Sequence, residues 1–241
     1  MEKELEIKTP DRKYINGALG FSKKKTSKLV IFVHGFTGHA NEHIFFNGSK
    51  FLTTNGFDTF RFDLYAGGKK RHRHFKDVSI SLHGKDINSV VDYFRKKYKE
   101  IIVVGHSYGG VSLLFTDQSK IDGFIFWDAS YISSKDARED MFFNKKMNRY
   151  VLDWGIEILV GNRFVKELKN FKDCGELAGR ITKPVLFITA GKGNSKDGIK
   201  YFKYANRPKK LINIKTADHN FNSWESEEEL IRHTYNWLRQ F

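Results

Sequence analysis

The sequence predicts an α/β protein whose sheet is mostly parallel and carries helices on both faces. Short apolar runs alternate with segments of helical periodicity along most of the chain. Two of those runs, residues 28–33 and 101–104, are continuously apolar, which is typical of strands covered on both sides. A chain of 241 residues suits one domain of this class, so we expect a single domain over residues 1–241.

The first part of the chain predicts an edge hairpin, a buried strand and a helix. Residues 4–8 alternate between polar and apolar side chains, and residues 14–21 follow a turn as their hairpin partner. The run at 28–33 predicts the first buried strand. Residues 41–55 are expected to form a helix that stops before Gly56.

The middle of the chain predicts two more strands and two helices. Residues 57–63 are expected to form a strand, and a loop rich in glycine, lysine and histidine follows at 64–75. Apolar side chains recur at helical spacing in residues 84–98, which predicts an amphipathic helix with a basic outer face. A strand at 101–104 and a buried helix from residue 111 come next.

The remaining sequence predicts an insertion between strands. Residues 123–128 form an apolar strand that ends in the carboxylate of Asp128. Residues 129–183 then break the alternation, and we expect two or more helices there. The last predicted elements are a strand at 184–189, a polar loop at 191–198, a helix at 199–205, a strand at 211–214 and a final helix that a capping box of Ser226 and Glu229 begins.

A serine flanked by glycines lies between the strand at 101–104 and the helix after it. Ser107 has Gly105 and Gly109 two residues away on either side, which is the pattern of a nucleophile elbow. Glycine lets neighbouring backbone approach where a Cβ would collide, and the strained turn would hold the Ser107 hydroxyl clear of the sheet. The pattern alone arises by chance, but this strand-before, helix-after context makes it specific. We predict Ser107 to be a nucleophile.

A serine nucleophile needs a base and a site for the oxyanion that forms. His219 lies between the last predicted strand and the last helix, so it is expected at the same edge of the sheet as Ser107. An oxyanion hole needs two amide donors. The Tyr108 N–H is one, and the loop after the first buried strand offers Phe36 or Thr37, of which we predict Phe36.

Three motifs give nearly the whole chain a resemblance to the α/β-hydrolases. They are His34-Gly35-Phe36, the segment from Gly105 to Gly109, and Ala217-Asp218-His219, in the family's order and each at a strand end. In detail the chain is similar to small-acyl and cinnamoyl-type carboxylesterases and to serine-aminopeptidase-like members. The resemblance implies an eight-stranded, mostly parallel sheet with a helical cap, residues 129–183, inserted after the sixth strand.

The resemblance also implies that this cap lines an acyl pocket. Met141, Phe142 and Trp154 are then expected to bind substrate together with Thr37. Packing within the cap explains its aromatic side chains equally well.

The third member of a catalytic triad is where the sequence departs from the family. The family usually places an acid a few residues after the strand at 184–189, and this chain has Asn194 there. Asparagine can orient an imidazole but cannot stabilise its cation by charge. Asp128 and Asp197 are the two candidates to replace it, and the position of Asp128 resembles the acid site of pancreatic-type lipases. A weakened or absent acid is the remaining alternative.

The sequence indicates neither a metal site nor a cofactor. The pairs His39 with His43 and His72 with His74 do not complete a ligand set at a recognised spacing. No phosphate-binding glycine fingerprint is present. The single cysteine, Cys174, excludes an internal disulfide bond.

The formal net charge of +14 is spread along the chain in short basic runs. This scatter indicates solvated surfaces and argues against a nucleic-acid site, although a preference for anionic substrates stays open. No apolar run approaches the ~20 residues that span a membrane, and the N-terminus has no signal-peptide pattern. We expect a cytoplasmic monomer or homodimer without membrane insertion.

These residues together predict a serine hydrolase that cleaves carboxylic esters of small or medium acyl groups through an acyl-enzyme. A peptidase, thioesterase or amidase with the same triad is an alternative, because the cap determines the substrate. An alternative of another class is a catalytically silent binding protein on a hydrolase fold, which Asn194 at the usual acid position suggests.

Overall fold

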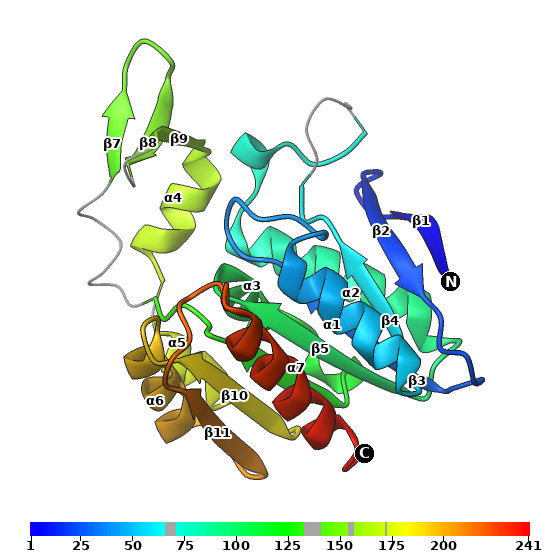
Figure 1. Ribbon diagram of the computed structural model, residues 1–241. Coiled ribbons are helices and arrows are strands. Elements are labelled where there is room, and N and C mark those ends of the chain that lie inside the picture. The colour runs from blue at the N-terminus through cyan, green and yellow to red at the C-terminus, as the bar shows by residue number, and fades with distance from the viewer. Residues whose placement is uncertain (66–70, 133–140, 154–156, 172) are drawn as a thin grey trace.

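The computed structural model describes residues 1–241 apart from 66–70, 133–140, 154–156 and 172. Its centre is an eight-stranded sheet in the order β1-β2-β4-β3-β5-β6-β10-β11 (Figure 1). These strands are β1 (Glu2–Lys8), β2 (Tyr14–Gly20), β3 (Lys28–Val33), β4 (Asp58–Phe62), β5 (Glu100–His106), β6 (Gly123–Trp127), β10 (Val185–Ala190) and β11 (Lys209–Ile214). Within this sheet of described strands, β1 with β2 and β2 with β4 pair antiparallel and the other neighbours pair parallel. The predicted mostly parallel sheet of eight strands is confirmed.

Helices cover both faces of this sheet. On one face lie α1 (His43–Thr54) and α7 (Trp224–Leu238), which share a hydrophobic core with the strands. On the other lie α2 (Ile80–Arg95), α3 (Tyr108–Leu113) and α6 (Ser195–Tyr204). The 3₁₀ helices η1 (Phe75–Asp77) and η2 (Gln118–Lys120) lie in the connections.

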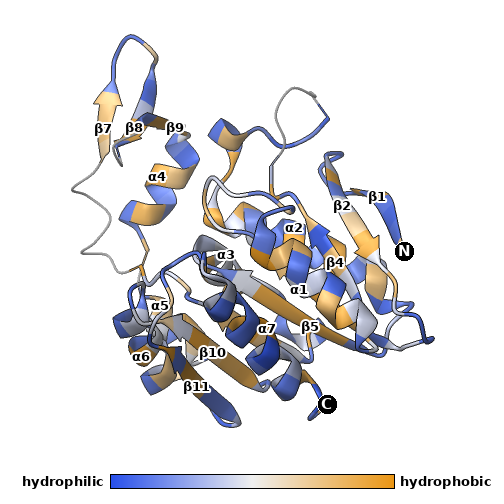
Figure 2. Ribbon diagram, viewed as in Figure 1, coloured by the Kyte–Doolittle hydropathy of each residue, from blue (hydrophilic) through white to orange (hydrophobic). Residues whose placement is uncertain are grey.

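The continuous apolar runs are explained by these two cores. Successive strand residues point to opposite faces, so Val30 and Val104 pack under α1 and α7 while Ile31 and Val103 pack under α2 and α3. All four side chains are fully buried. Figure 2 shows the central strands coloured as hydrophobic and α7 with a hydrophilic face turned outward. A strand at the centre of such a sheet has no solvent-facing side.

The insertion lies between β6 and β10, after the sixth strand as expected, and it holds the two helices expected there, but an antiparallel sheet precedes them, so the cap is not purely helical. It contains an antiparallel sheet of β7 (Met141–Asn144), β8 (Arg149–Asp153) and β9 (Glu157–Val160), followed by α4 (Asn162–Lys169) and α5 (Cys174–Ala178). Its short β-branched and aromatic segments fit a pleated surface better than a helix. The sequence does not predict this antiparallel sheet, because charged residues between the three strands interrupt the alternation of polar and apolar side chains.

Several helix ends differ from the sequence prediction because of caps. Helix α2 begins at Ile80, where the Ser79 hydroxyl accepts the Leu82 N–H at 3.4 Å, one turn before the predicted start. The capping box predicted at Ser226 is wrong, since Ser223 caps α7 by accepting the Ser226 N–H at 3.2 Å. Helix α6 begins inside the segment predicted as a polar loop.

The insertion stands over the carboxyl-terminal edge of the sheet (Figure 1). The Phe164 ring of α4 stacks on Phe36 with ring centroids 5.2 Å apart, and Glu167 accepts the Ser81 N–H of α2 at 3.0 Å. The loop after β3 is therefore covered by the insertion. In the described part of the chain no helix is both long and apolar enough to cross a membrane.

Candidate active site

Ser107 occupies the turn between β5 and α3 with a φ of 52° and a ψ of −121°. A positive φ is uncommon for a residue with a side chain, and surrounding structure must hold it. A Cβ on Gly109 would lie 2.4 Å from the Val33 carbonyl oxygen, and one on Gly105 would lie 2.7 Å from the Gly109 carbonyl carbon. Glycine permits both approaches, so the turn has the geometry of a nucleophile elbow.

Ser107, His219 and Asp128 form a chain of hydrogen bonds. The Ser107 Oγ is 2.9 Å from His219 Nε2, and His219 Nδ1 is 2.6 Å from Asp128 Oδ2. The three residues follow β5, β11 and β6, and parallel strands present their carboxyl ends at one edge of a sheet. The structure thus brings together the serine and the histidine that the sequence singled out, with Asp128 as the carboxylate in contact.

Asp128 is fully buried, and backbone amides hold its carboxylate. The Ala190 N–H donates to Oδ1 at 2.8 Å and the Asn194 N–H donates to Oδ2 at 2.9 Å. The Asn194 side-chain amide also donates to the Asp128 main-chain carbonyl at 3.0 Å. Asn194, at the position where the family usually has an acid, therefore anchors the carboxylate that contacts His219.

Asp197 is directed elsewhere. It lies in the first turn of α6, where Oδ2 accepts the Tyr131 N–H at 3.2 Å and Oδ1 pairs with the Lys200 ammonium at 3.1 Å. These partners place its carboxylate on the α6 side. The structure does not bring Asp197 to His219.

The Gly35–Phe36 peptide is fixed by two side chains. His34 accepts the Leu64 N–H at Nε2 at 2.9 Å, and its Nδ1 lies 2.7 Å from the Gly35 carbonyl. Burial lowers the pKa of His34 to about 4, so the neutral ring donates its Nδ1–H to that carbonyl. The Tyr65 hydroxyl donates to it as well at 3.4 Å. Since a trans peptide directs its N–H opposite to its C=O, the Phe36 N–H is turned away from His34 and Tyr65.

Tyr108 is the first residue of α3, where backbone N–H groups have no partner within the helix. Its ring packs against Phe36 and Phe164, with centroids 5.3 Å and 6.0 Å away, and its hydroxyl lies 3.0 Å from His83 Nδ1. Tyr108 thus joins the elbow to the loop after β3 and to the insertion.

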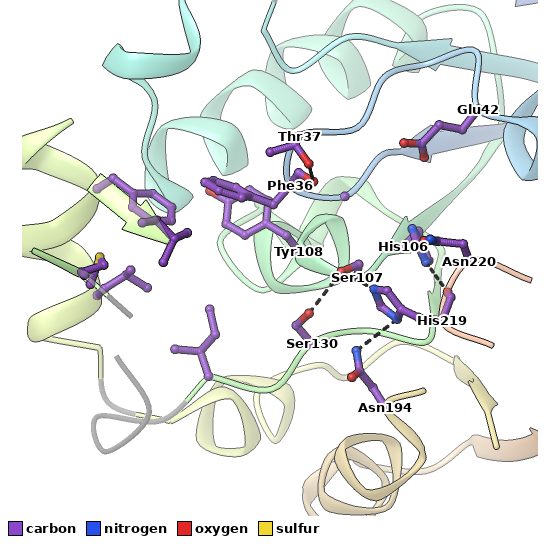
Figure 3. Close-up of a pocket in the computed structure, with 16 residues that line it drawn as sticks. Phe36, Thr37, Glu42, His106, Ser107, Tyr108, Ser130, Asn194, His219 and Asn220 are labelled. Carbon is purple, nitrogen blue, oxygen red and sulfur yellow. Dashed lines mark hydrogen bonds between the residues drawn. The ribbon is translucent and has the colours of Figure 1, made fainter. Parts of the chain in front are cut away.

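Sequence reasoning missed Ser130 and underestimated His106. Ser130 Oγ lies 3.2 Å from Ser107 Oγ (Figure 3). The Ser130 carbonyl accepts the Tyr201 hydroxyl at 2.7 Å. His106 donates its Nε2–H to the His219 carbonyl at 2.9 Å, and burial lowers its pKa to about 4. The sequence offers one signal for Ser130: it lies just past the end of a predicted strand, at the edge of the sheet where Ser107 is expected. Nothing in the sequence places His106 against His219.

A cavity of about 520 Å³ opens above Ser107. Of the predicted substrate-binding residues, Thr37 and Met141 line it. Phe142 is not among the described residues that line the cavity: it is 45% exposed, because neighbouring strand residues point to opposite faces and Met141 lines the cavity. Trp154 lies outside the described residues.

Other candidate sites behave as ordinary structure. Among the residues that the structure describes, no group of three or more His, Cys, Asp or Glu side chains could hold a metal ion. Burial raises the pKa of Cys174 to about 12, so its thiol is not activated.

The sequence model of one family, described as "Serine aminopeptidase, S33", matches residues 24–157, more than half of the chain. The chain belongs to this family. It is an α/β-hydrolase by family and by fold. No curated protein matches the sequence of this hydrolase.

Solved structures share its fold at low sequence identity. Est1E from Butyrivibrio proteoclasticus with bound ferulic acid is 22% identical with a TM-score of 0.83, over 98% of each chain. The esterase domain of a Rhodothermus marinus protein is 17% identical with a TM-score of 0.78, covering 100% of this chain and 98% of that one. The Pyrococcus furiosus esterase Pf2001 is 20% identical with a TM-score of 0.74, covering 100% and 93%.

Proposed function

We propose that this hydrolase cleaves carboxylic esters of small or medium acyl groups through a serine acyl-enzyme. The observation that carries the proposal is the hydrogen-bonded chain from Asp128 through His219 to Ser107, at the floor of a cavity of about 520 Å³. A serine hydroxyl becomes a useful nucleophile when a neutral imidazole accepts its proton and a carboxylate holds that imidazole. The hydroxyl, the imidazole and the carboxylate are in hydrogen-bond contact here.

In the acylation step, Ser107 Oγ attacks the ester carbonyl carbon and its proton passes to His219 Nε2. Asp128 stabilises the imidazolium that forms, and the amides of Phe36 and Tyr108 receive the oxyanion. The tetrahedral intermediate then breaks its bond to the leaving oxygen, and His219 returns the proton to that alcohol. His106 serves as a positioning residue, since it holds the main chain of His219.

Ser130 contacts the Ser107 nucleophile during acylation. Because Ser107 donates its own proton to His219, its oxygen is free to accept the Ser130 hydroxyl 3.2 Å away. In deacylation a water attacks the acyl carbon and gives its proton to His219. The bond between the acyl carbon and Ser107 Oγ then breaks, His219 returns the proton to Ser107 Oγ, and the carboxylic acid leaves.

The substrate class is supported by the cavity walls. Apolar side chains from the insertion and the loop after β3 make one end of the cavity: Phe36, Ile132, Met141, Leu152, Phe164 and Leu168. Such a lining suits an aliphatic or aromatic acyl group. Structural neighbours named as esterases agree with this choice.

An amide or peptide substrate is the second candidate, because the matching family is described as a serine aminopeptidase. The same residues perform amide cleavage, which differs in protonating an amine instead of an alcohol. The catalytically silent binding protein was suggested by Asn194 at the usual acid position. The two hydrogen bonds that Asn194 donates to Asp128 weaken that alternative, because a carboxylate is then available beside His219.

The test is initial rates on p-nitrophenyl esters of increasing acyl length, with wild type beside Ser107→Ala. We expect an optimum at short or medium acyl length, and a loss in the variant to the residual level left when a triad member is removed. Labelling of wild type by a fluorophosphonate probe, absent in Ser107→Ala, is the companion measurement.

Equal ester turnover by wild type and Ser107→Ala would exclude Ser107 as the nucleophile. A folded wild type that neither turns over esters nor reacts with the probe would favour the catalytically silent binding protein. Probe labelling without ester turnover would favour the amide substrate.

A further inference from the structure

The cavity above Ser107 has two chemically different ends. Side chains from the yellow-green insertion lie at one end, and Glu42 and Asn220 lie at the other, with Ser107 and His219 between them (Figure 3). The first end is apolar. The second end carries a carboxylate and a side-chain amide.

Glu42 is held at this polar end by local structure. It immediately precedes α1, is half-buried, and accepts a hydrogen bond from the His39 backbone. A Cβ on Gly38 would lie 2.5 Å from Glu42 Oε1, so the carboxylate rests against the loop that carries Phe36. Burial raises the pKa of this carboxyl group. Its ionised form therefore has less water around it than a surface glutamate.

Within the described residues, the charged groups that influence the Glu42 carboxylate are the histidines His39, His43 and His219. In the described part of the chain, no lysine or arginine forms an ion pair with Glu42. Among the described residues that line the cavity, Glu42 is the one acid and no lysine or arginine is present. The charge inside the cavity is thus opposite in sign to the formal net charge of +14.

The polar end is the side on which a leaving group would lie. His219 must pass its proton to the leaving alcohol, so that alcohol lies next to His219 Nε2. His219 and Glu42 are near enough to influence one another electrostatically, and Asn220 is the next residue in the chain. An acyl group under the insertion leaves the alcohol pointing toward Glu42.

We propose that Glu42 forms a cation-binding subsite for the leaving group, which makes esters of ammonium-bearing alcohols preferred substrates. This inference rests on the proposed ester hydrolysis and is the reverse of the preference for anionic substrates that the net charge left open. A half-buried carboxylate that pairs with no described lysine or arginine attracts an ammonium ion and repels a carboxylate, and reduced solvation strengthens both effects.

The test compares two esters of the same size and different charge, butyrylcholine and 3,3-dimethylbutyl butyrate. We expect wild type to favour the choline ester in kcat/KM by about fivefold, as fits an ion pair that is partly exposed to water. Glu42→Gln, which keeps the shape and removes the charge, should abolish that preference and bring the ratio of the two kcat/KM values to about one. Glu4→Gln on the exposed edge strand β1 is the matched control for net charge, and should behave as wild type.

A second readout does not depend on turnover. Titration calorimetry with choline and with 3,3-dimethylbutan-1-ol should show tighter binding of choline to wild type and no difference for Glu42→Gln. Equal kcat/KM values for the two esters, together with equal affinities for the two alcohols in wild type, would overturn the subsite. An equal loss on both esters in Glu42→Gln would also overturn it and would assign Glu42 to holding the loop. Glu42-dependent choline binding without ester turnover would keep the subsite and reject the proposed ester hydrolysis.

Discussion

Asp128 and Asp197 differ in what their carboxylates touch, and this difference can be tested directly. The first lies 2.6 Å from His219 Nδ1, while the second pairs with Lys200 at 3.1 Å. Asp128→Asn should lower kcat by roughly 10³–10⁴-fold, as loss of the acid does in serine hydrolases. Asp197→Asn should stay within about threefold, since its carboxylate contacts Lys200 and the Tyr131 N–H rather than His219.

Rates on a p-nitrophenyl ester, with circular dichroism to verify folding, measure both variants. A small effect of Asp128→Asn would show that its contact with His219 is not needed for turnover.

Gly193 controls how closely the backbone approaches this acid. A Cβ there would lie 2.3 Å from Asp128 Oδ2 and 3.1 Å from the His219 Cα, so either group must shift. We expect Gly193→Ala to lower kcat by about a hundredfold, the scale on which a small displacement of a catalytic group acts. Ester kinetics with a thermal melt separate this effect from unfolding.

Gly179→Ala is the matched control, because the nearest atom to its added Cβ would be 3.4 Å away and the residue has a φ of −62°. Similar losses in the two variants would contradict the local explanation.

At the scale of elements, the alternation of strand β7 decides which insertion residues face the substrate. Met141 lines the cavity and Phe142 is 45% exposed on the opposite side. Met141→Ala should enlarge the apolar end and move the acyl-length optimum to longer chains. Phe142→Ala should leave that optimum unchanged.

The acyl-length series on p-nitrophenyl esters measures both variants. A shift with Phe142→Ala but not with Met141→Ala would mean that the strand presents its other face to substrate.

Caps and short strands also explain which element predictions failed. Strands buried on both faces carry an unbroken apolar signal, and this is why β3 was predicted to the residue. The insertion sheet is partly exposed, so Lys145 and Lys146 interrupt its hydrophobic pattern. The sequence prediction starts α7 about one turn late because Ser223 and Ser226 are both acceptable caps, and in the structure it is the Ser223 hydroxyl that accepts the Ser226 N–H.

At the scale of the whole molecule, buried histidines make stability depend on pH. Burial lowers the pKa of His34 and of His106 to about 4 each, against about 6.5 in an unfolded chain. Between those values the unfolded state binds more protons, so the free energy of unfolding falls as pH is lowered from about 6.5 to about 4. The loss is of order 3 kcal/mol per histidine. Burial raises the pKa of Asp86 to about 6, which offsets part of it.

Urea unfolding at several pH values from 7.5 to 4.5 measures this fall. His106→Gln should reduce the slope, since one protonation is removed. A free energy of unfolding that stays constant down to pH 4.5 would contradict the neutral state assigned to these rings.

The sequence by itself determined the fold class, a mostly parallel sheet, and the placement of Ser107 and His219 at one edge of it. These features follow from local patterns: apolar runs of strand length, glycines around a turn, and strand ends that meet at one edge of a parallel sheet. Each of these patterns lies within a few consecutive residues, so the sequence alone is enough to recognise it. The count of eight strands was what the resemblance to the α/β-hydrolases implied.

Tertiary structure alone decided that Asp128 and not Asp197 meets His219, that Met141 and not Phe142 lines the cavity, and that Glu42 shares the cavity with Ser107. Each depends on where segments far apart in the chain come to lie, and Asp128 is 91 residues from His219. The physical reason is that a carboxylate contacts an imidazole through space. Sequence patterns report strand ends, while packing fixes which side chains at those ends point toward each other.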